Sequence, residues 1–176
     1  MELETTLINR VAESDLQTIA LDEFMMDNNI VEFDLKGYLF QGLILREKDF
    51  REALKIIDWS AYTGKYLAVH CSTDAIIPMW AFMLISSQAV KFAQGIYYGT
   101  KAEVSVKVLV DAIESKDWSY LKDKRVVIKG CSDQEIPAAA YLSIGKKLQP
   151  YVQSMMYGEP CSTVPIFKRP RVILNA

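Results

Sequence analysis

The residues of this chain best suited to chemistry are three cysteines, Cys71, Cys131 and Cys161, each followed directly by a serine. Cys71 and Cys131 each end a short apolar run, and sixty residues separate them. Thiolates are soft ligands that select zinc, copper(I) or iron–sulfur clusters. The three cysteines therefore predict a thiolate site for zinc or iron.

The spacing of the cysteines matches no compact metal motif, because the chain has no Cys-x-x-Cys and the separations are sixty and thirty residues. Only the fold could bring these ligands together, with His70, Asp133 or Glu159 as the fourth. His70 is disfavoured, since neighbouring residues on a strand point to opposite faces and Cys71 is its neighbour. The competing interpretation is that the cysteines are small, buried core residues.

A second hypothesis places a small anion at the Cys-Ser turns, where the N-termini of helices expose N–H groups. The residues expected to bind it are Ser72, Ser132, Asp133, Glu159 and Ser162. In an enzyme of this kind Cys131 would be the nucleophile, with Asp133 or Glu159 as the proton carrier. The chain contains no Walker loop, Gly-x-Gly-x-x-Gly or Gly-x-Ser-x-Gly motif, so it indicates no particular reaction.

The segments that contain the first two cysteines, about residues 65–99 and 125–158, resemble each other. Nine positions are identical once Ile77 is skipped, among them both Cys-Ser pairs and Pro78 with Pro137. Each segment has the pattern of a strand, a loop, an apolar helix and a second strand, which is a βαβ unit. The sequence therefore predicts an internal βαβ repeat.

Apolar runs and helical spacing predict the remaining elements. The runs at 66–69 and 126–128 are continuous, as is typical of parallel strands covered on both faces. A proline at the first turn begins each of two helices, at about 78–93 and 137–152. Further helices are expected at 47–57 and 102–113, a hairpin of strands at 31–35 and 38–45, and a strand at 155–157.

These elements predict a single α/β domain over residues 1–176, with a mostly parallel sheet and helices on both faces. Residues 1–25 stay unassigned, and residues 160–176 are expected to form an extended C-terminal tail. Because ligands bind beyond the carboxyl ends of parallel strands, Cys71, Cys131 and Cys161 are expected at one edge of the sheet.

Composition limits the classes of partner. A net charge of −2 and a pI near 5.5 argue against nucleic-acid binding, and the basic residues Lys168, Arg169 and Arg171 are interpreted as a solvated tail. The longest apolar stretch, 75–87, is too short to span a bilayer, and no signal peptide begins the chain, so a cytoplasmic protein is expected. A third hypothesis is an interaction module that forms a homodimer through apolar segments such as 154–157 and 172–174.

Four segments, FQGLILREKDFRE, CSTDAIIPMWAFM, RVVIKGCSD and YGEPCSTVPIFKR, resemble a family from Bacteroidetes that is catalogued as a domain of unknown function (number 2480). The resemblance runs from about Asn9 to Arg169. It implies no activity or catalytic residue. It does imply a link to iron–sulfur assembly proteins, near whose genes members of this family often lie, and this favours the thiolate interpretation of the cysteines.

Overall fold

The computed structural model describes residues 16–25, 29–129, 135–159 and 162–170. The chain divides into two compact units, which we call the middle unit (Met26–Val108) and the terminal unit (Met1–Met25 with Leu109–Ala176). Each unit combines helices with a mostly parallel sheet, so the predicted α/β class is confirmed. No helix in the described ranges is long and apolar enough to cross a membrane.

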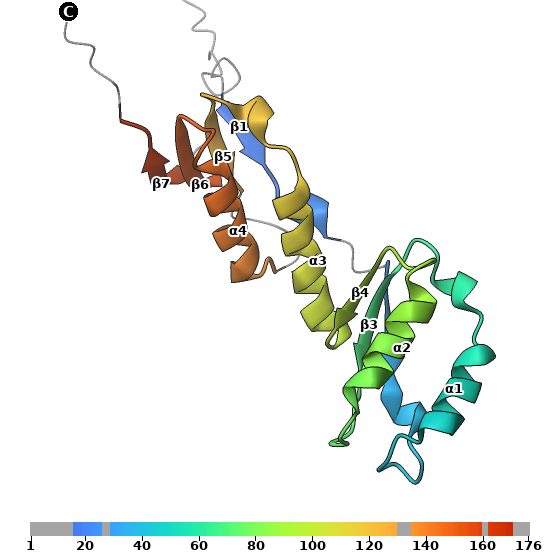
Figure 1. Ribbon diagram of the computed structural model, residues 1–176. Helices are drawn as coiled ribbons and strands as arrows, with labels where there is room; N and C mark the ends of the chain where they lie inside the picture. The colour runs from blue at the N-terminus through green and yellow to red at the C-terminus, as the bar shows by residue number, and fades with distance from the viewer. Residues whose placement is uncertain (1–15, 26–28, 130–134, 160–161, 171–176) are drawn as a thin grey trace, which may run out of the picture. The chain divides into compact units, whose positions relative to one another are not determined.

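The middle unit contains a three-stranded parallel sheet in the order β2-β3-β4 (Figure 1). Its elements are β2 (Ile30–Asp34), α1 (Glu47–Lys55), β3 (Tyr66–His70), α2 (Met79–Ala89), β4 (Gly95–Tyr98) and the first part of α3 (Lys101–Ser115). Leu67 and Val69 of β3 face α1 and α2, whereas Ala68 between them faces α3. Leu67, Ala68 and Val69 form a continuous apolar run, as is typical of a parallel strand covered on both faces.

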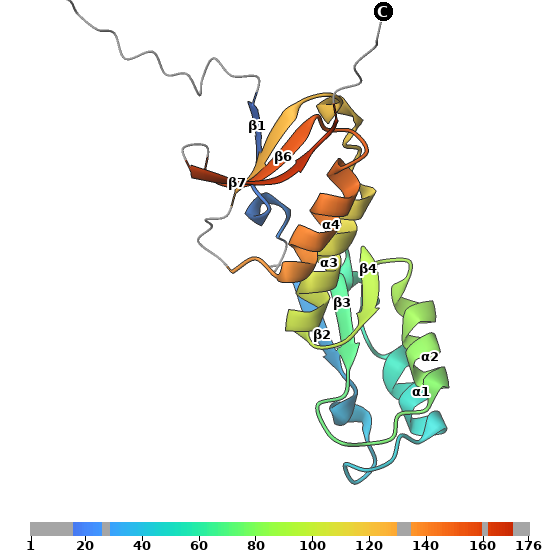
Figure 2. The ribbon, with the colours of Figure 1, turned by 90° about the vertical axis from the view of Figure 1, so that its left-hand side faces the viewer.

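The terminal unit contains a four-stranded sheet in the order β1-β5-β6-β7, in which only β7 is antiparallel to its neighbour (Figure 2). Its elements are β1 (Leu16–Ile19), the last part of α3, β5 (Arg125–Ile128), α4 (Ala138–Leu148), β6 (Ser154–Glu159) and β7 (Ser162–Lys168). Val126 and Ile128 of β5 pack in one cluster with Ile144 of α4 and Ile113 of α3.

Prolines begin two of the helices, as predicted. Pro78 and Pro137 are the N-cap residues of α2 and α4, both with φ near −60° and extended ψ. Neither helix is as long as predicted, because α2 ends at Ala89 and α4 at Leu148. The predicted helices at 47–57 and 102–113 correspond to α1 and α3.

Three expectations from the sequence are wrong. The strands form two sheets rather than one, because β3 pairs only with β2 and β4, while β5 pairs with β1 and β6. The predicted second strand of the hairpin is absent: the Asp34 side chain accepts a hydrogen bond from the Lys36 N–H, and a 3₁₀ helix follows over Leu35–Tyr38. The predicted extended tail instead contains β7, which pairs with β6 with one register shift between Met155 and Met156.

The two units share local structure at one constant offset along the chain, which we call the Trp59-to-Trp118 offset. The Nε1–H of Trp59 donates to the Leu54 carbonyl and that of Trp118 donates to the Ile113 carbonyl, at 3.1 and 2.9 Å. The same offset relates the parallel pairs β3-β4 and β5-β6, where Tyr66 lies opposite Gly95 and Arg125 opposite Ser154. The predicted alignment paired Cys71 with Cys131, sixty residues apart, and reached a separation of fifty-nine only after it skipped Ile77. The Trp59-to-Trp118 offset is fifty-nine, so at this offset Cys71 corresponds to position 130. The internal repeat itself stays a prediction.

Candidate functional site

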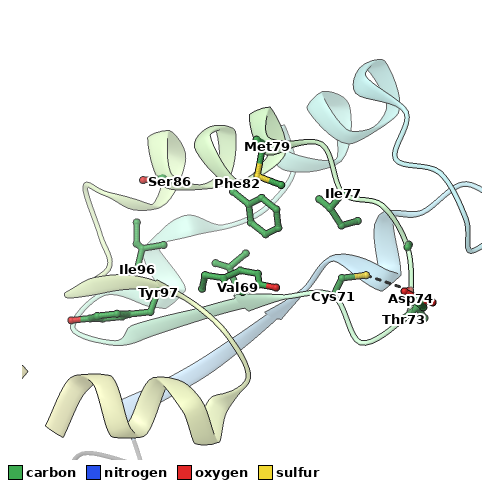
Figure 3. A pocket seen from close by; sticks show the side chains of 12 residues that line it. Val69, Cys71, Thr73, Asp74, Ile77, Met79, Phe82, Ser86, Ile96 and Tyr97 are labelled. Carbon is green, nitrogen blue, oxygen red and sulfur yellow. Dashed lines mark hydrogen bonds between the residues drawn. The ribbon is translucent and has the colours of Figure 1, made fainter. Parts of the chain in front are cut away.

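A cavity of about 670 Å³ lies in the middle unit, at the carboxyl ends of β3 and β4 and beneath α2 (Figure 3). Parallel sheets of this kind bind ligands beyond the carboxyl ends of their strands. The residues that line the cavity are Val69, Cys71, Thr73, Asp74, Ala75, Ile77, Met79, Phe82, Ser86, Ile96, Tyr97 and Tyr98. We call this cavity the Cys71 pocket.

The walls of the Cys71 pocket are apolar because two secondary structures present their apolar positions to it. Met79 and Phe82 come from successive turns of α2, and Val69 of β3 and Ile96 of β4 lie on the face of the sheet that α2 covers (Figure 3). The Phe82 and Tyr98 rings meet edge to face, with centroids 5.6 Å apart and planes at 81°. This arrangement is favourable for aromatic rings and defines one wall.

The polar groups of the Cys71 pocket are concentrated at the loop after β3. The Cys71 thiol lies 3.3 Å from the Thr73 hydroxyl. Asp74, which follows Thr73 in the sequence, adds a carboxylate to the lining (Figure 3). Ser86 adds a hydroxyl from α2. Among the described residues that line this pocket there is no lysine, arginine or histidine. The pocket therefore presents a carboxylate and neutral hydrogen-bonding groups to a ligand.

Ser72, which the sequence assigned to anion binding, is instead bound to a carboxylate. Its N–H and hydroxyl donate to the two oxygens of Asp34, at 3.0 and 2.6 Å. This clamp ties the end of β2 to the loop after β3. Burial alone would raise the pKa of the Asp34 carboxyl, but hydrogen bonds from Ser72 and the Lys36 N–H, together with attraction to His70, hold that pKa below its usual value.

Replacing Ser72 by alanine is expected to raise the pKa of Asp34, because one donor to the carboxylate is lost. A carboxyl group with a lowered pKa in the folded state stabilises the fold above its unfolded pKa, about 3.9, and that contribution is lost as the pH falls through the folded value. The stability difference between wild type and Ser72→Ala should therefore be present at neutral pH and shrink below about pH 4.

An NMR titration of the Asp34 carboxyl carbon measures this pKa directly. Ser87→Ala is the matched control, since its hydroxyl donates to the Leu84 carbonyl rather than to a carboxylate. An Asp34 pKa that is equal in wild type and Ser72→Ala would contradict the role assigned to the clamp.

His70 and Cys71 lie on opposite faces of the sheet, as their neighbouring positions predict. Cys71 packs against the cluster beneath α1 and α2. The Nε2 atom of His70 lies 3.2 Å from the Glu32 carboxylate but forms no hydrogen bond with it. The same Glu32 carboxylate accepts the Lys101 N–H at the start of α3. The chain's single imidazole is therefore not a base for the Cys71 thiol.

The other predicted site residues belong to the terminal unit or lie outside the described residues. Glu159 and Ser162 pair with each other where β6 meets β7. Cys131, Ser132, Asp133 and Cys161 lie outside the described residues. The three cysteines were expected at one edge of a single sheet. The described strands do not form that sheet, because β3, which precedes Cys71, belongs to a different sheet from β5 and β6.

No group of three or more His, Cys, Asp and Glu side chains in the described ranges is arranged to hold a metal ion. The described cysteine, Cys71, has Thr73 as its polar neighbour and no second thiol among the residues that the structure describes. The thiolate site over Cys71, Cys131 and Cys161 stays a prediction, since two of its three ligands are not described.

Several residues of the Cys71 pocket were not identified from the sequence, among them Phe82, Ser86 and Tyr98. Two patterns in the sequence mark them. Met79, Phe82 and Ser86 recur at the helical spacing of three and four residues, and Ile96 and Tyr98 alternate along a strand. Both patterns also describe a plain core, and the tertiary structure alone shows that these faces line a cavity.

Comparison with known proteins identifies the family of this chain. The family model that matches the chain is described as a protein of unknown function (DUF2480), and it covers residues 5–169. The family predicted from the four sequence segments is thus confirmed. No curated protein and no solved structure matches the chain.

Proposed function

We propose that this chain, which belongs to the family of unknown function DUF2480, is a binding protein for a small molecule with an apolar body and a neutral or positively charged polar group. The observation that carries the proposal is the Cys71 pocket, with its apolar walls and the single carboxylate of Asp74. Its volume of about 670 Å³ is in the range of small-molecule sites, roughly 300–1,000 Å³.

The charge of the pocket favours this class of ligand over the small anion that the sequence suggested. An anion would meet the Asp74 carboxylate with no cationic side chain among the described lining residues to balance it. The two negative charges would repel each other, and the anion would also lose favourable hydration on entering the pocket. A cation or a neutral donor would instead pair with Asp74 or with the hydroxyl of Thr73.

The position of the thiol supports binding rather than nucleophilic catalysis. A cysteine nucleophile is activated by a base or a cation within hydrogen-bond reach. Cys71 has the Thr73 hydroxyl at 3.3 Å, and His70 lies on the other face of the sheet. In this proposal the thiol and hydroxyl form a neutral polar end of the pocket that orients the ligand.

Three probes with one apolar body test the proposed charge preference: indole, tryptamine and indole-3-acetate. We expect tryptamine to bind at least as tightly as indole and roughly tenfold more tightly than indole-3-acetate, which corresponds to about 1.4 kcal/mol. Methyl NMR with labels on Val69 and Ile96 locates the binding and gives the dissociation constants. Binding of indole-3-acetate in preference to tryptamine would overturn the proposal.

Two variants make the test specific to the pocket. Ser86→Leu is expected to fill it from α2 and abolish the shifts, because Ser86 is exposed on the pocket side of the helix. Asp74→Asn is expected to keep indole binding and to remove the difference between tryptamine and indole-3-acetate. Unchanged binding of all three probes to Ser86→Leu would place them elsewhere.

The predicted thiolate site for zinc or iron is a separate proposal that rests on Cys71, Cys131 and Cys161. It implies stoichiometric metal in protein purified anaerobically without a metal-affinity step, and loss of that metal in Cys131→Ser. Elemental analysis decides it, and metal-free wild-type protein would contradict it. The expected partners, iron–sulfur assembly proteins and a second copy of the chain, stay predictions with it.

A further inference from the structure

We propose a second ligand site in the terminal unit, for an uncharged, apolar small molecule. The site is a cavity of about 480 Å³ between α4 and the strands β5, β6 and β7, which we call the Gly145 groove. The described residues that line it all belong to the terminal unit. The proposal rests on the geometry of this groove and does not depend on occupancy of the Cys71 pocket.

The Gly145 groove is built from the same positions as the Cys71 pocket. Six of its lining residues correspond, at the Trp59-to-Trp118 offset, to residues that line the Cys71 pocket. These six are Ile128, Ala138, Tyr141, Gly145, Met155 and Tyr157. Two units thus form a cavity in the same place, between a helix and two parallel strands.

An aromatic wall is common to both cavities. The Tyr141 and Tyr157 rings meet edge to face with centroids 5.6 Å apart and planes at 81°, the same geometry as Phe82 and Tyr98. Each pair joins the helix to the second parallel strand, β4 in one unit and β6 in the other. Both units therefore have one aromatic ring on the helix and one on the strand, at positions that correspond between the units.

Gly145 leaves unoccupied space on the groove side of α4. A Cβ atom added to it would have no other atom within 4 Å. Gly145 lies in the last turn of α4, which ends at Leu148, and glycine within a helix destabilises it relative to alanine. The corresponding residue of the Cys71 pocket is Ser86. A position without a side chain, beside open space, lets another molecule approach the helix backbone closely.

The chemistry of the lining defines the ligand class. The eight described residues that line the groove are aliphatic, aromatic, methionine or glycine, and none of these eight carries a charge. The positions that correspond to Cys71, Thr73 and Asp74 lie outside the described residues, and Ile166 of β7 adds a further apolar wall. A charged ligand would lose its hydration against these eight described residues. An uncharged hydrocarbon or aromatic molecule would not.

Toluene is the probe for this site, with methyl NMR of the full chain as the readout. In wild type we expect toluene to shift the methyl signals of Ile128, Met155 and Ile166. Gly145→Leu should weaken this binding at least tenfold, because the new side chain extends into the groove without a clash at Cβ. Ser86→Leu should leave it unchanged, which separates this site from the Cys71 pocket.

A second variant tests the groove independently, in case Gly145→Leu weakens binding by altering the fold. Ile166 is 59% exposed on the edge strand β7, so Ile166→Asp should preserve the fold and place a carboxylate in the groove wall. It is also expected to weaken toluene binding at least tenfold. The proposal is overturned if toluene leaves the three wild-type methyl signals unmoved, or if both variants bind it as wild type does.

Discussion

Replacing Trp118 by alanine is expected to lower the free energy of unfolding by about 3–5 kcal/mol, the cost of removing a large aromatic side chain from a packed core. Trp118 is 1% exposed. It lies in the cluster that joins β1, α3, β5 and α4 of the terminal unit. Its Nε1–H donates to the Ile113 carbonyl at 2.9 Å, so the substitution also leaves that acceptor without its partner.

Urea unfolding followed by far-UV circular dichroism measures this loss without relying on tryptophan fluorescence. Tyr120→Ala is the matched control: Tyr120 is also aromatic and contacts the Trp118 ring, but it is 57% exposed. The control should change the free energy of unfolding by less than about 1 kcal/mol. Equal effects of the two substitutions would show that Trp118 is not a core residue of the terminal unit.

Replacing Gly158 by alanine is expected to cost about 2–3 kcal/mol, because the backbone adopts a conformation that side chains strain. Gly158 has φ +122°, and an added Cβ would lie 2.5 Å from the Ser162 carbonyl oxygen on β7. That oxygen belongs to the backbone of the paired strand, so the clash can be relieved only by moving β7 away from β6. The pairing at this end of the hairpin should loosen.

Two other glycines calibrate this effect. Gly99 has φ +135°, but its added Cβ would meet the flexible Glu103 side chain first, so Gly99→Ala should cost less than Gly158→Ala. Gly37 has no atom within 4 Å of an added Cβ and no positive φ, so Gly37→Ala should be neutral or stabilise by about 0.4–1 kcal/mol. Thermal unfolding of the three variants gives the order, and a stability of Gly158→Ala equal to that of Gly37→Ala would contradict it.

The two cavities together suggest how one local structure can bind two kinds of molecule. In both units a helix that follows a proline N-cap covers two parallel strands and leaves a cavity with an aromatic wall. The loop after β3 adds Thr73 and Asp74 to one cavity, whereas β7 adds Ile166 to the other. Among the described residues, the loop after β3 therefore makes the first cavity partly polar, and β7 adds an apolar wall to the second.

The sequence by itself located the helices α1, α2, α3 and α4 and the central strands β3 and β5. Continuous apolar runs predicted β3 and β5, and Pro78 and Pro137 predicted where α2 and α4 begin. These features are visible because they depend on residues within a few positions of one another. The matching Asp-Trp-Ser segments that begin at Asp58 and Asp117 are equally local, and would have extended the predicted correspondence and given the Trp59-to-Trp118 offset.

Only the tertiary structure decided which strands share a sheet and which side chains share a cavity. Leu16 pairs with Arg125 in the second half of the chain, and nothing local to β1 indicates that partner. The same holds for the contact of Ser72 with Asp34, which turned a predicted anion ligand into part of a carboxylate clamp. Pairing between distant segments depends on the balance of loop closure and burial over the whole chain. A cysteine at the end of an apolar run therefore predicts a strand end, but not its neighbours.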